Sequence, residues 1–346
     1  MKELILDGRF LEQPLTGVQR FAVEILKEFA KIDDLHVIVA MPSNAKPMPL
    51  EAKNIEFVRV GSRGGTLWEQ FDLPKFCRKK KLPLLCTGNT APFFYRSNVV
   101  LHDVLWLDMK TYAPKRSWTF KSRVMIRSFV YRSKNLFTVS AFSSDRIKQN
   151  FRKIKKAPVV LYNGYEHIFD WREERMENLP KSFYLAVGSV YPHKNFKYIL
   201  HLAKNNPDVN FVIAGKKNTD YEAFLEQNHI TNCFFTGYVS DGQLFWLYKN
   251  CEGFLLPSLY EGFGIPPLEA VACGCRKIIL SDIPVFHEIY GDCATYFDPL
   301  NYDNTVTLST QEISETAAEA LLESYRWKNA AEIIIKTIFY ECEHEE

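Results

Sequence analysis

The chain has 346 residues, of which 47% are apolar and 24% charged, with glycine and proline at ordinary frequencies. This composition fits a soluble globular protein with sizeable cores, and it excludes the collagen-like, coiled-coil and largely disordered classes. Since domains commonly run to about 100 to 200 residues, the length predicts two domains.

Neither a membrane span nor a disulfide framework is expected. No apolar run approaches the roughly 18 to 20 residues that a membrane-spanning helix needs, and the apolar stretch before Asp7 is too short for a signal peptide. Eight cysteines are spread over the chain, and the nearest pair, Cys273 and Cys275, lacks the spacing of a zinc site. We therefore expect reduced thiols and a cytoplasmic location.

The net charge of +2 conceals a strong asymmetry. Residues 1–160 hold 29 Lys and Arg against 14 Asp and Glu, a net of +15, whereas residues 161–346 hold 14 against 27, a net of −13. Such a division suggests that the two halves meet different partners.

The first half alternates short β-branched or aromatic runs with helical periodicities, which indicates βα units and parallel sheets. An amphipathic helix is predicted from Val18 to Phe29, where apolar residues recur at i, i+3, i+4 and i+7. The strands predicted in this half are Leu4–Asp7, Val37–Ala40, Ile55–Val60, Leu84–Thr87, Val99–His102, Phe137–Ser140 and Val159–Tyr162.

A polar, charged stretch from Asn163 to Lys181 then breaks the pattern and is interpreted as an interdomain linker. A second βα series follows, with helices at about 195–204, 219–228, 241–250 and 266–273. Its predicted strands are Phe183–Gly188, Phe211–Gly215, Cys233–Gly237, Phe254–Pro257, Lys277–Ser281 and Ala294–Phe297. This order predicts two Rossmann-like halves facing each other across a cleft, with ligands at the carboxyl ends of the strands.

The most informative stretch runs from residue 260 to residue 270. Gly262 and Gly264 let backbone N–H groups approach a ligand closely, and paired prolines then pre-set the first turn of a helix. Glu261 and Glu269 lie eight residues apart, and each carboxylate can accept hydrogen bonds from a pair of sugar hydroxyls. The pattern therefore fits a ligand that is both phosphorylated and polyhydroxylated. An ordinary surface loop, followed by a helix whose acid favours the dipole, is the alternative.

This Glu-x7-Glu pattern with an internal Gly-Phe-Gly resembles the donor-site signature of retaining GT-B glycosyltransferases, specifically glycosyltransferase family 4 (group 1). Further matches follow in family order over nearly the whole chain, at Tyr162–Gly164, Leu185–Ser189, Pro192–Asn195, Phe211–Gly215, Phe235–Val239, Ser281–Pro284, Glu288, Tyr296–Pro299 and Arg326–Ala331. The resemblance implies an α/β GT-B fold. Its parts would be an acceptor-binding domain over 1–165, a nucleotide-sugar-binding domain over 166–325 and a C-terminal helix over 326–346 that packs back on the first domain.

The resemblance also implies roles for single residues. Glu269 would bind the ribose hydroxyls of the donor, Glu261 would orient the donor sugar, and Lys194 would hold the pyrophosphate. His102 would contact the donor sugar, so that Glu261, His102 and Lys194 form the catalytic set. The other donor-binding residues that it implies are Gly17, Val18, Ser189, His193, Lys216, Val239, Gly262, Phe263 and Gly264.

Three alternatives stay open. Many members carry an arginine where this chain has Ser189 or His193, so either residue could replace that arginine in the phosphate loop. Lys194 could be a solvated residue beside a helix start, and His102 a structural histidine. No Asp-x-Asp motif occurs in the sequence, and the resemblance implies an enzyme without a metal or other cofactor.

The first half of the chain also contains a basic stretch that the donor-site motifs do not include. From Met109 to Ser144 the chain has no acidic residue, and Arg78–Lys81 forms a second basic cluster. The basic residues of the stretch are Lys110, Lys115, Arg116, Lys121, Arg123, Arg127, Arg132 and Lys134. A solvated helix face is the plain interpretation, and an anionic membrane surface is the functional one. No nucleic-acid module is present, so nucleic acid is not expected as a partner.

Together these features predict a retaining glycosyltransferase that moves a hexosyl group (mannosyl, glucosyl, galactosyl, rhamnosyl or similar). The donor would be a GDP-, UDP- or dTDP-linked sugar, and the acceptor a lipid-linked or oligosaccharide intermediate in making a bacterial surface polysaccharide. The enzyme would lie peripherally on the inner face of the plasma membrane. The alternatives are another GT-B enzyme, such as a nucleotide-sugar epimerase, and a non-catalytic scaffold that binds membrane or polyanion.

Overall fold

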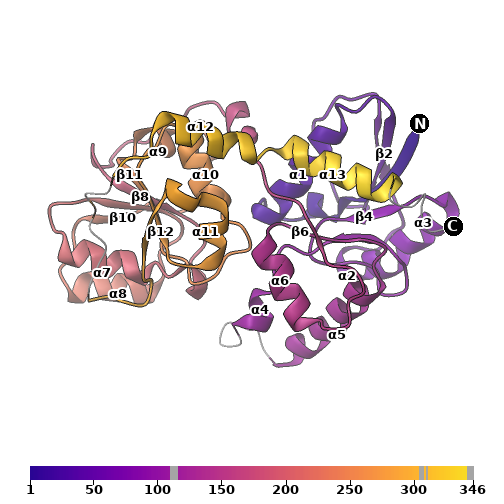
Figure 1. Cartoon of the computed structure of the whole chain (residues 1–346), viewed down its shortest axis with the longest axis horizontal. Helices are drawn as coiled ribbons and strands as arrows, with labels where there is room; N and C mark the ends of the chain where they lie inside the picture. Colours follow the sequence, from indigo (N-terminus) through magenta and orange to yellow (C-terminus); the bar gives the residue numbers. More distant parts are fainter. Residues whose placement is uncertain (110–115, 304–307, 309–310, 341–346) are drawn as a thin grey trace. The chain divides into compact units, whose positions relative to one another are not determined.

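The computed structural model describes residues 1–109, 116–303, 308 and 311–340, with side chains left out for 116–123 (Figure 1). Contacts divide the chain into two compact units. Unit 1 joins Met1–Asn163 to the segment that starts at Trp327, and unit 2 is Gly164–Arg326. These boundaries lie within two residues of those expected from the sequence, after 165 and after 325.

Unit 1 is built on a seven-stranded parallel sheet in the order β3-β2-β1-β4-β5-β6-β7. Each strand overlaps one that the sequence predicts. Their bounds are β1 Lys2–Asp7, β2 Leu35–Met41, β3 Ile55–Arg59, β4 Leu84–Cys86, β5 Asn98–Val100, β6 Leu136–Thr138 and β7 Val159–Val160.

Helices cover both faces of this sheet. The bounds of the α-helices are α1 Gly17–Phe29, α2 Gly65–Leu67, α3 Leu73–Lys80, α4 Leu105–Asp108, α5 Arg116–Arg132, α6 Ala141–Asn150 and α13 Trp327–Phe339. A 3-10 turn η1 (Gly8–Glu12) follows β1, and a π-helical turn η2 (Trp68–Asp72) leads into α3. The predicted amphipathic helix is α1, and the C-terminal helix α13 packs against it, with the Phe21 and Trp327 rings 5.9 Å apart (Figure 1).

The core under α3, α5 and α6 is a continuous cluster of buried side chains. It joins Ile5 and Ile38 of the sheet to Trp68, Phe129 and Phe151. Because this cluster excludes water from the apolar faces of α5 and α6, it holds the two helices beside each other.

Unit 2 has a six-stranded parallel sheet in the order β10-β9-β8-β11-β12-β13. The bounds are β8 Tyr184–Val187, β9 Phe211–Ala214, β10 Cys233–Phe235, β11 Gly253–Leu256, β12 Ile278–Ser281 and β13 Thr295–Phe297. The strand order reverses between β8 and β11, so the loops after these two strands border the switch point where open α/β sheets bind ligands.

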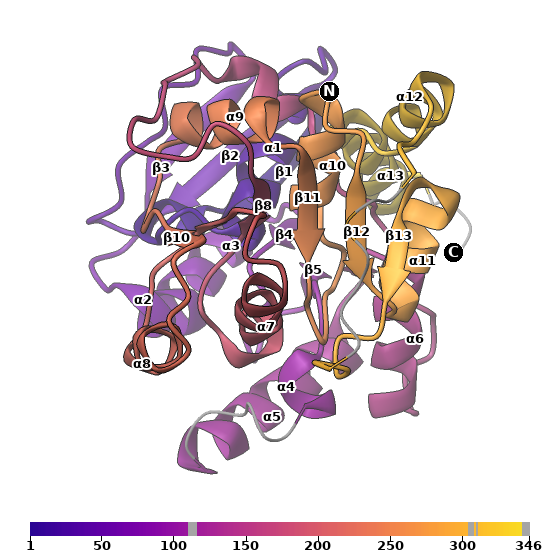
Figure 2. The same ribbon diagram turned by 90° about the vertical axis from the view of Figure 1, so that its left-hand side faces the viewer.

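The helices of unit 2 form two groups. α7 packs with α8, and α10 packs with α9 and α12 (Figures 1 and 2). The bounds are α7 Lys197–Asn205, α8 Thr219–Gln227, α9 Asp241–Asn250, α10 Ile265–Ala272, α11 Pro284–Tyr290 and α12 Glu315–Ser324, with 3-10 turns η4 Glu166–Asp170, η5 Pro192–Lys194 and η6 Gly291–Cys293. Among the described helices, none combines the length and the apolar character that crossing a membrane requires.

The interpretation of 163–181 as a linker is wrong at its start. The chain changes unit after Asn163, and η4 folds into unit 2 with His167 and Ile168 buried. The charged residues around these two positions dominate the composition of the stretch and hide the short segment that packs inside.

Candidate functional site

The loop between β11 and α10 carries Glu261 at the switch point of unit 2 and leads to Glu269 on α10. Gly264 immediately precedes α10 with φ +91°, and a Cβ added there would lie 2.6 Å from a ring carbon of Phe286. Only glycine fits this position, because it adopts positive φ and has no side chain. Pro266 and Pro267 then occupy the first turn of α10, as the sequence predicts, and Glu269 follows in the next turn.

The loops after β8 and β11 are tied together by an ion pair. Lys194 Nζ donates to Glu261 Oε1 at 2.6 Å, and the hydroxyl of Ser258 donates to the same oxygen at 2.6 Å. The backbone N–H of Leu259 donates to the carbonyl of His193 at 2.7 Å. The Lys194 and Glu261 side chains are 17% and 12% exposed, so this pair is partly shielded from solvent. The structure therefore brings together two residues that the sequence assigns to the catalytic set.

Glu269 occupies a buried niche on α10. Its Oε1 lies 2.8 Å from His167 Nε2, and its Oε2 accepts a hydrogen bond of 2.6 Å from the Tyr248 hydroxyl. Tyr248 is fully buried on α9, and this burial, together with the charge of Glu269, raises the pKa of its phenol well above the usual value. Tyr248 therefore stays protonated and donates. The two contacts together fix the orientation of the Glu269 carboxylate.

The sequence missed the residues that hold these carboxylates, namely His167, Tyr248 and Ser258. His167 lies in the stretch interpreted as a linker, and Tyr248 lies on a helix read only as a spacer. The single available signal was the apolar pair Ile168 and Phe169 within an otherwise charged segment.

The other residues of unit 2 that are expected around the donor lie in the loops that follow β8, β9, β10 and β11. Ser189 and Lys216 are exposed, and Lys216 Nζ lies 4.8 Å from the centre of the Tyr238 ring. Half-buried Val239 and Gly262 follow β10 and β11, whereas the Phe263 side chain is buried against Tyr325. Because that ring points inward, Phe263 has only its backbone to offer a ligand.

His193 lies in the loop after β8, as the middle residue of η5. Its ring stacks on that of Tyr191, with centroids 5.8 Å apart. Burial and the charge of Lys194 lower the pKa of this histidine, so it is neutral at pH 7. His193 can therefore serve as a hydrogen-bonding residue, but it does not supply the charge of the arginine that many family members carry.

In unit 1, His102 lies beyond the carboxyl end of β5. Its Nε2 is 2.9 Å from the carbonyl of Thr87, and its backbone N–H donates to Asn89 Oδ1 at 2.7 Å. Because a carbonyl only accepts, Nε2 carries the hydrogen and Nδ1 is the acceptor. The edge-on ring of Phe21 packs 5.0 Å away, and burial lowers the pKa of His102 to about 4. The imidazole is therefore neutral at pH 7.

Gly17 and Val18 form the first turn of α1 in unit 1. Gly17 is exposed, and a Cβ added there would meet no atom within 4 Å. The first N–H groups of a helix have no partner within the helix and carry partial positive charge. The exposed Gly17 leaves this end of α1 accessible, and its role in donor binding stays a prediction.

Among the described residues, no group of three or more His, Cys, Asp or Glu side chains is arranged to hold a metal ion.

The chain is similar to known proteins in sequence and in fold. The sequence profile of the family described as "Glycosyl transferases group 1" matches residues 168–332. The O-antigen chain mannosyltransferase RfbU of Salmonella typhimurium is 32% identical over 235 residues, which cover 66% of this chain and 63% of RfbU. The chain thus spans less than two thirds of that relative's length.

Two further likenesses extend over nearly the whole chain. The O-antigen chain mannosyltransferase B of Escherichia coli is 24% identical over 94% of this chain and 97% of its own length. The crystal structure of WaaG, "a glycosyltransferase involved in lipopolysaccharide biosynthesis", superposes with a TM-score of 0.70 over 98% of this chain and all of WaaG, at 15% identity. At that identity the likeness concerns the fold, and it confirms the predicted GT-B class. Residues 168–332 of the chain are thus similar to the glycosyl transferases group 1 family.

Proposed function

We propose that the protein is a retaining glycosyltransferase of family 4 that moves a hexosyl group from a nucleotide sugar to an acceptor hydroxyl. The acceptor would be a lipid-linked or oligosaccharide intermediate of a bacterial surface polysaccharide. Two relatives named as O-antigen mannosyltransferases favour mannosyl as the transferred group. In the reaction, the bond from the anomeric carbon to the diphosphate oxygen breaks and a bond to the acceptor oxygen forms, while the proton of the acceptor hydroxyl passes to the departing nucleoside diphosphate.

The observation that carries this proposal is the pair of held carboxylates at the switch point of unit 2. Glu269, fixed by His167 and Tyr248, would accept hydrogen bonds from the ribose hydroxyls of a nucleotide. Glu261, fixed by Lys194 and Ser258, would meet the donor sugar. A carboxylate locked in one rotamer loses little conformational entropy on binding, which favours a precise sugar site.

Lys194 can serve both Glu261 and a diphosphate. An ammonium group has three N–H donors, and the bond to Glu261 uses one of them. The other two can donate to oxygens of the departing nucleoside diphosphate and stabilise the charge that develops there. A compact point charge suits this role, and no metal ion is required by it.

We propose that catalysis is independent of metal. The test is activity in excess EDTA, which should equal the untreated rate. Loss of activity in EDTA with recovery on adding Mn²⁺ would overturn this part of the proposal.

The donor assignment is tested by thermal shift over the common nucleoside diphosphates and their sugar conjugates, including GDP, UDP and dTDP. A ligand present at about a hundred times its Kd stabilises a protein by about 2.7 kcal/mol, which such a screen resolves. Product analysis with a labelled sugar donor then distinguishes transfer from epimerisation. A protein that binds no nucleotide would instead be a scaffold.

We also propose that unit 1 docks on the inner, anionic face of the plasma membrane. The net charge of +15 over residues 1–160 and the acid-free stretch 109–144 support this. Each Lys or Arg near an anionic surface contributes about 1 kcal/mol. Of the basic residues in the stretch, Lys110, Lys115, Arg116, Lys121 and Arg123 have side chains outside the described part of the structure. Co-sedimentation with anionic and zwitterionic vesicles at low and high salt tests the proposal, and equal pelleting with both lipids would refute it.

A further inference from the structure

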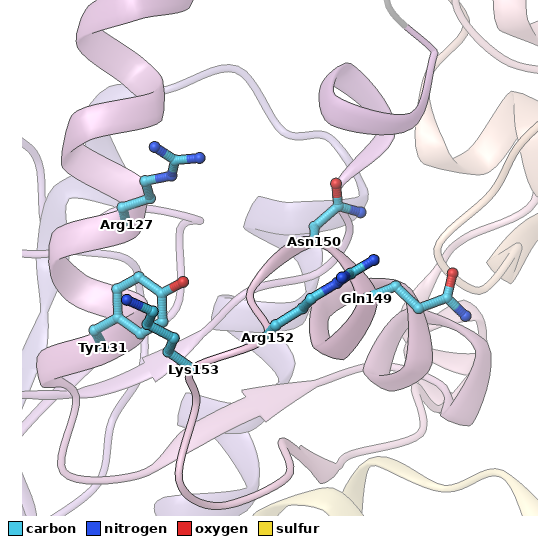
Figure 3. Close-up of a pocket in the computed structure, with 6 residues that line it drawn as sticks. All are labelled: Arg127, Tyr131, Gln149, Asn150, Arg152 and Lys153. Atoms are coloured by element: carbon cyan, nitrogen blue, oxygen red, sulfur yellow. The ribbon is translucent and has the colours of Figure 1, made fainter.

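We propose that a basic pocket on unit 1, between α5 and the end of α6, binds a phosphate-bearing group. The pocket is a hollow of about 430 Å³ lined by Arg127, Tyr131, Gln149, Asn150, Arg152 and Lys153 (Figure 3). Both walls belong to unit 1, and the inference does not depend on glycosyl transfer.

The helices bring these side chains together for a physical reason. On α5, Ile126, Phe129 and Val130 face the core, which directs Arg127 and Tyr131, one turn apart, to the flank beside the pocket. On the opposite side, α6 ends at Asn150, and the chain continues through Arg152 and Lys153 (Figure 3). Phe151 and Ile147 anchor that end in the same core, so the two walls are held in place.

The charges in the pocket lack counter-ions. Within the part of the chain that the structure describes, Arg127, Arg152 and Lys153 make no ion pair, and no carboxylate lines the hollow. Asp108 reaches Asn150 from outside, but Arg146 holds both of its oxygens at 2.7 Å. Three cations around one hollow repel one another, and an anion between them would remove this repulsion.

The neutral side chains Asn150 and Tyr131 help to indicate which kind of anion fits the pocket. Both hydrogens of the Asn150 amide are engaged, by Asp108 and by the carbonyl of Arg146, so the amide stays fixed at the pocket wall. The Tyr131 ring packs edge-on against Phe151 at 6.0 Å, and its hydroxyl lies on the pocket side in Figure 3. Two guanidinium forks, an ammonium and a phenol match the several oxygens of a phosphate or pyrophosphate better than one carboxylate.

The position of the pocket beside a helix terminus offers a competing explanation. Cations near a helix C-terminus stabilise the helix dipole, which would account for Arg152 and Lys153 at the end of α6. That explanation does not account for Arg127, which lies five residues before the end of α5 and therefore outside its last turn. It also predicts that replacing these cations lowers stability without affecting any ligand.

Two double variants separate these explanations. Arg127→Gln with Lys153→Gln removes two charges from the pocket. Arg132→Gln with Lys155→Gln removes the same number of charges from exposed positions outside the pocket, one at the last residue of α5 and one in the chain after α6. Both variants keep unit 2 intact, so binding of pyrophosphate at the donor site cancels in the comparison.

The first measurement is calorimetric titration of the full chain with inorganic pyrophosphate at low ionic strength. The second is co-sedimentation with phosphatidylcholine vesicles containing either phosphatidic acid, which exposes a phosphate monoester, or phosphatidylserine. The pocket variant should bind more weakly than the control variant, by about tenfold, because charge-assisted hydrogen bonds are lost. A loss in solution identifies a soluble phosphorylated ligand, whereas a loss confined to phosphatidic acid vesicles identifies a lipid headgroup.

Melting temperatures measured in phosphate-free buffer show whether the variants are correctly folded. The pocket variant should melt no lower than the wild type, because removing converging like charges relieves repulsion. Equal binding by the two variants in both measurements would overturn the proposal. A lower melting temperature together with unchanged pyrophosphate binding would leave the helix dipole as the explanation and would likewise overturn it.

Discussion

The Tyr248 hydroxyl donates to Glu269 Oε2 at 2.6 Å, and both side chains are buried. A hydrogen bond to a charged group contributes about 1.5 to 3 kcal/mol, and a buried acceptor that loses its donor carries a similar cost. Tyr248 therefore does more than fill space under α10. It fixes the carboxylate that we assign to the ribose.

Replacing Tyr248 by phenylalanine should weaken nucleoside diphosphate binding by about tenfold. Without the tyrosine hydroxyl, Glu269 Oε2 loses its hydrogen-bond donor, and the carboxylate is no longer held in one orientation. Calorimetric titration with the nucleotide found in the thermal-shift screen measures this. Tyr184→Phe is a matched control, since Tyr184 is also buried in unit 2 and donates to the carbonyl of Leu308 at 2.9 Å. Both variants should lose stability, and only Tyr248→Phe should lose affinity. Equal affinities would show that Tyr248 has a structural role alone.

Replacing Lys194 by alanine should lower kcat/KM by at least about tenfold, equivalent to 1.4 kcal/mol of lost transition-state stabilisation. Glu261→Gln keeps the size of the side chain and should lower kcat more than it weakens nucleoside diphosphate binding, because Glu261 is assigned to the sugar. Steady-state kinetics with the cognate donor give both results. Lys249→Ala is the control, because it removes a lysine from an exposed ion pair with Glu173 on the same unit. A wild-type kcat/KM for Lys194→Ala would end its assignment to the diphosphate.

Asp7 gives a prediction on the pH dependence of stability. Asp7 is buried at the end of β1, and both this burial and the nearby charge of Glu69 raise its pKa. The charge of Arg9 lowers the pKa, but the net result is a value of about 7. The folded state therefore holds a proton that the unfolded chain releases near pH 4, and stability falls as the pH rises from about 4 to 7. Asp7→Asn should thus stabilise the protein at pH 8 and have much less effect at pH 4, as measured by urea denaturation. Asp33→Asn, at an exposed acid, should show no such trend, and a parallel trend would contradict the assignment.

Features fixed by neighbouring residues could be predicted from the sequence. The period of α1, the apolar runs of the strands and the spacing of Glu261 and Glu269 are all local patterns, and each corresponds to an observed element. Apart from the hydrogen bond from Ser258 to Glu261, the contacts that hold the two carboxylates are not local. His167 lies 102 residues before Glu269, and Lys194 lies 67 residues before Glu261. These pairs come into contact only when the helices and loops pack around the sheet, and no periodicity in the sequence indicates such contacts.

His102 supplies the last prediction. Its pKa is lowered to about 4 because burial disfavours the charged ring, whereas the unfolded chain protonates near the ordinary value of 6.5. A depressed histidine pKa contributes stability that is fully present above pH 6.5 and is lost as the pH falls toward 4. Between pH 8 and pH 5 this linkage amounts to about 2 kcal/mol.

The variant His102→Gln tests this linkage, because an amide can still donate to the carbonyl of Thr87 but does not ionise. At pH 8 it should be less stable than the wild type, since it loses the ring contact with Phe21. At pH 5 the deficit should shrink by about 2 kcal/mol, because only the wild type pays for keeping His102 neutral. Urea denaturation at the two pH values measures the difference, and the other titrating groups cancel between the two proteins. A deficit that is the same at both pH values would mean that the pKa of His102 is not lowered in the folded protein.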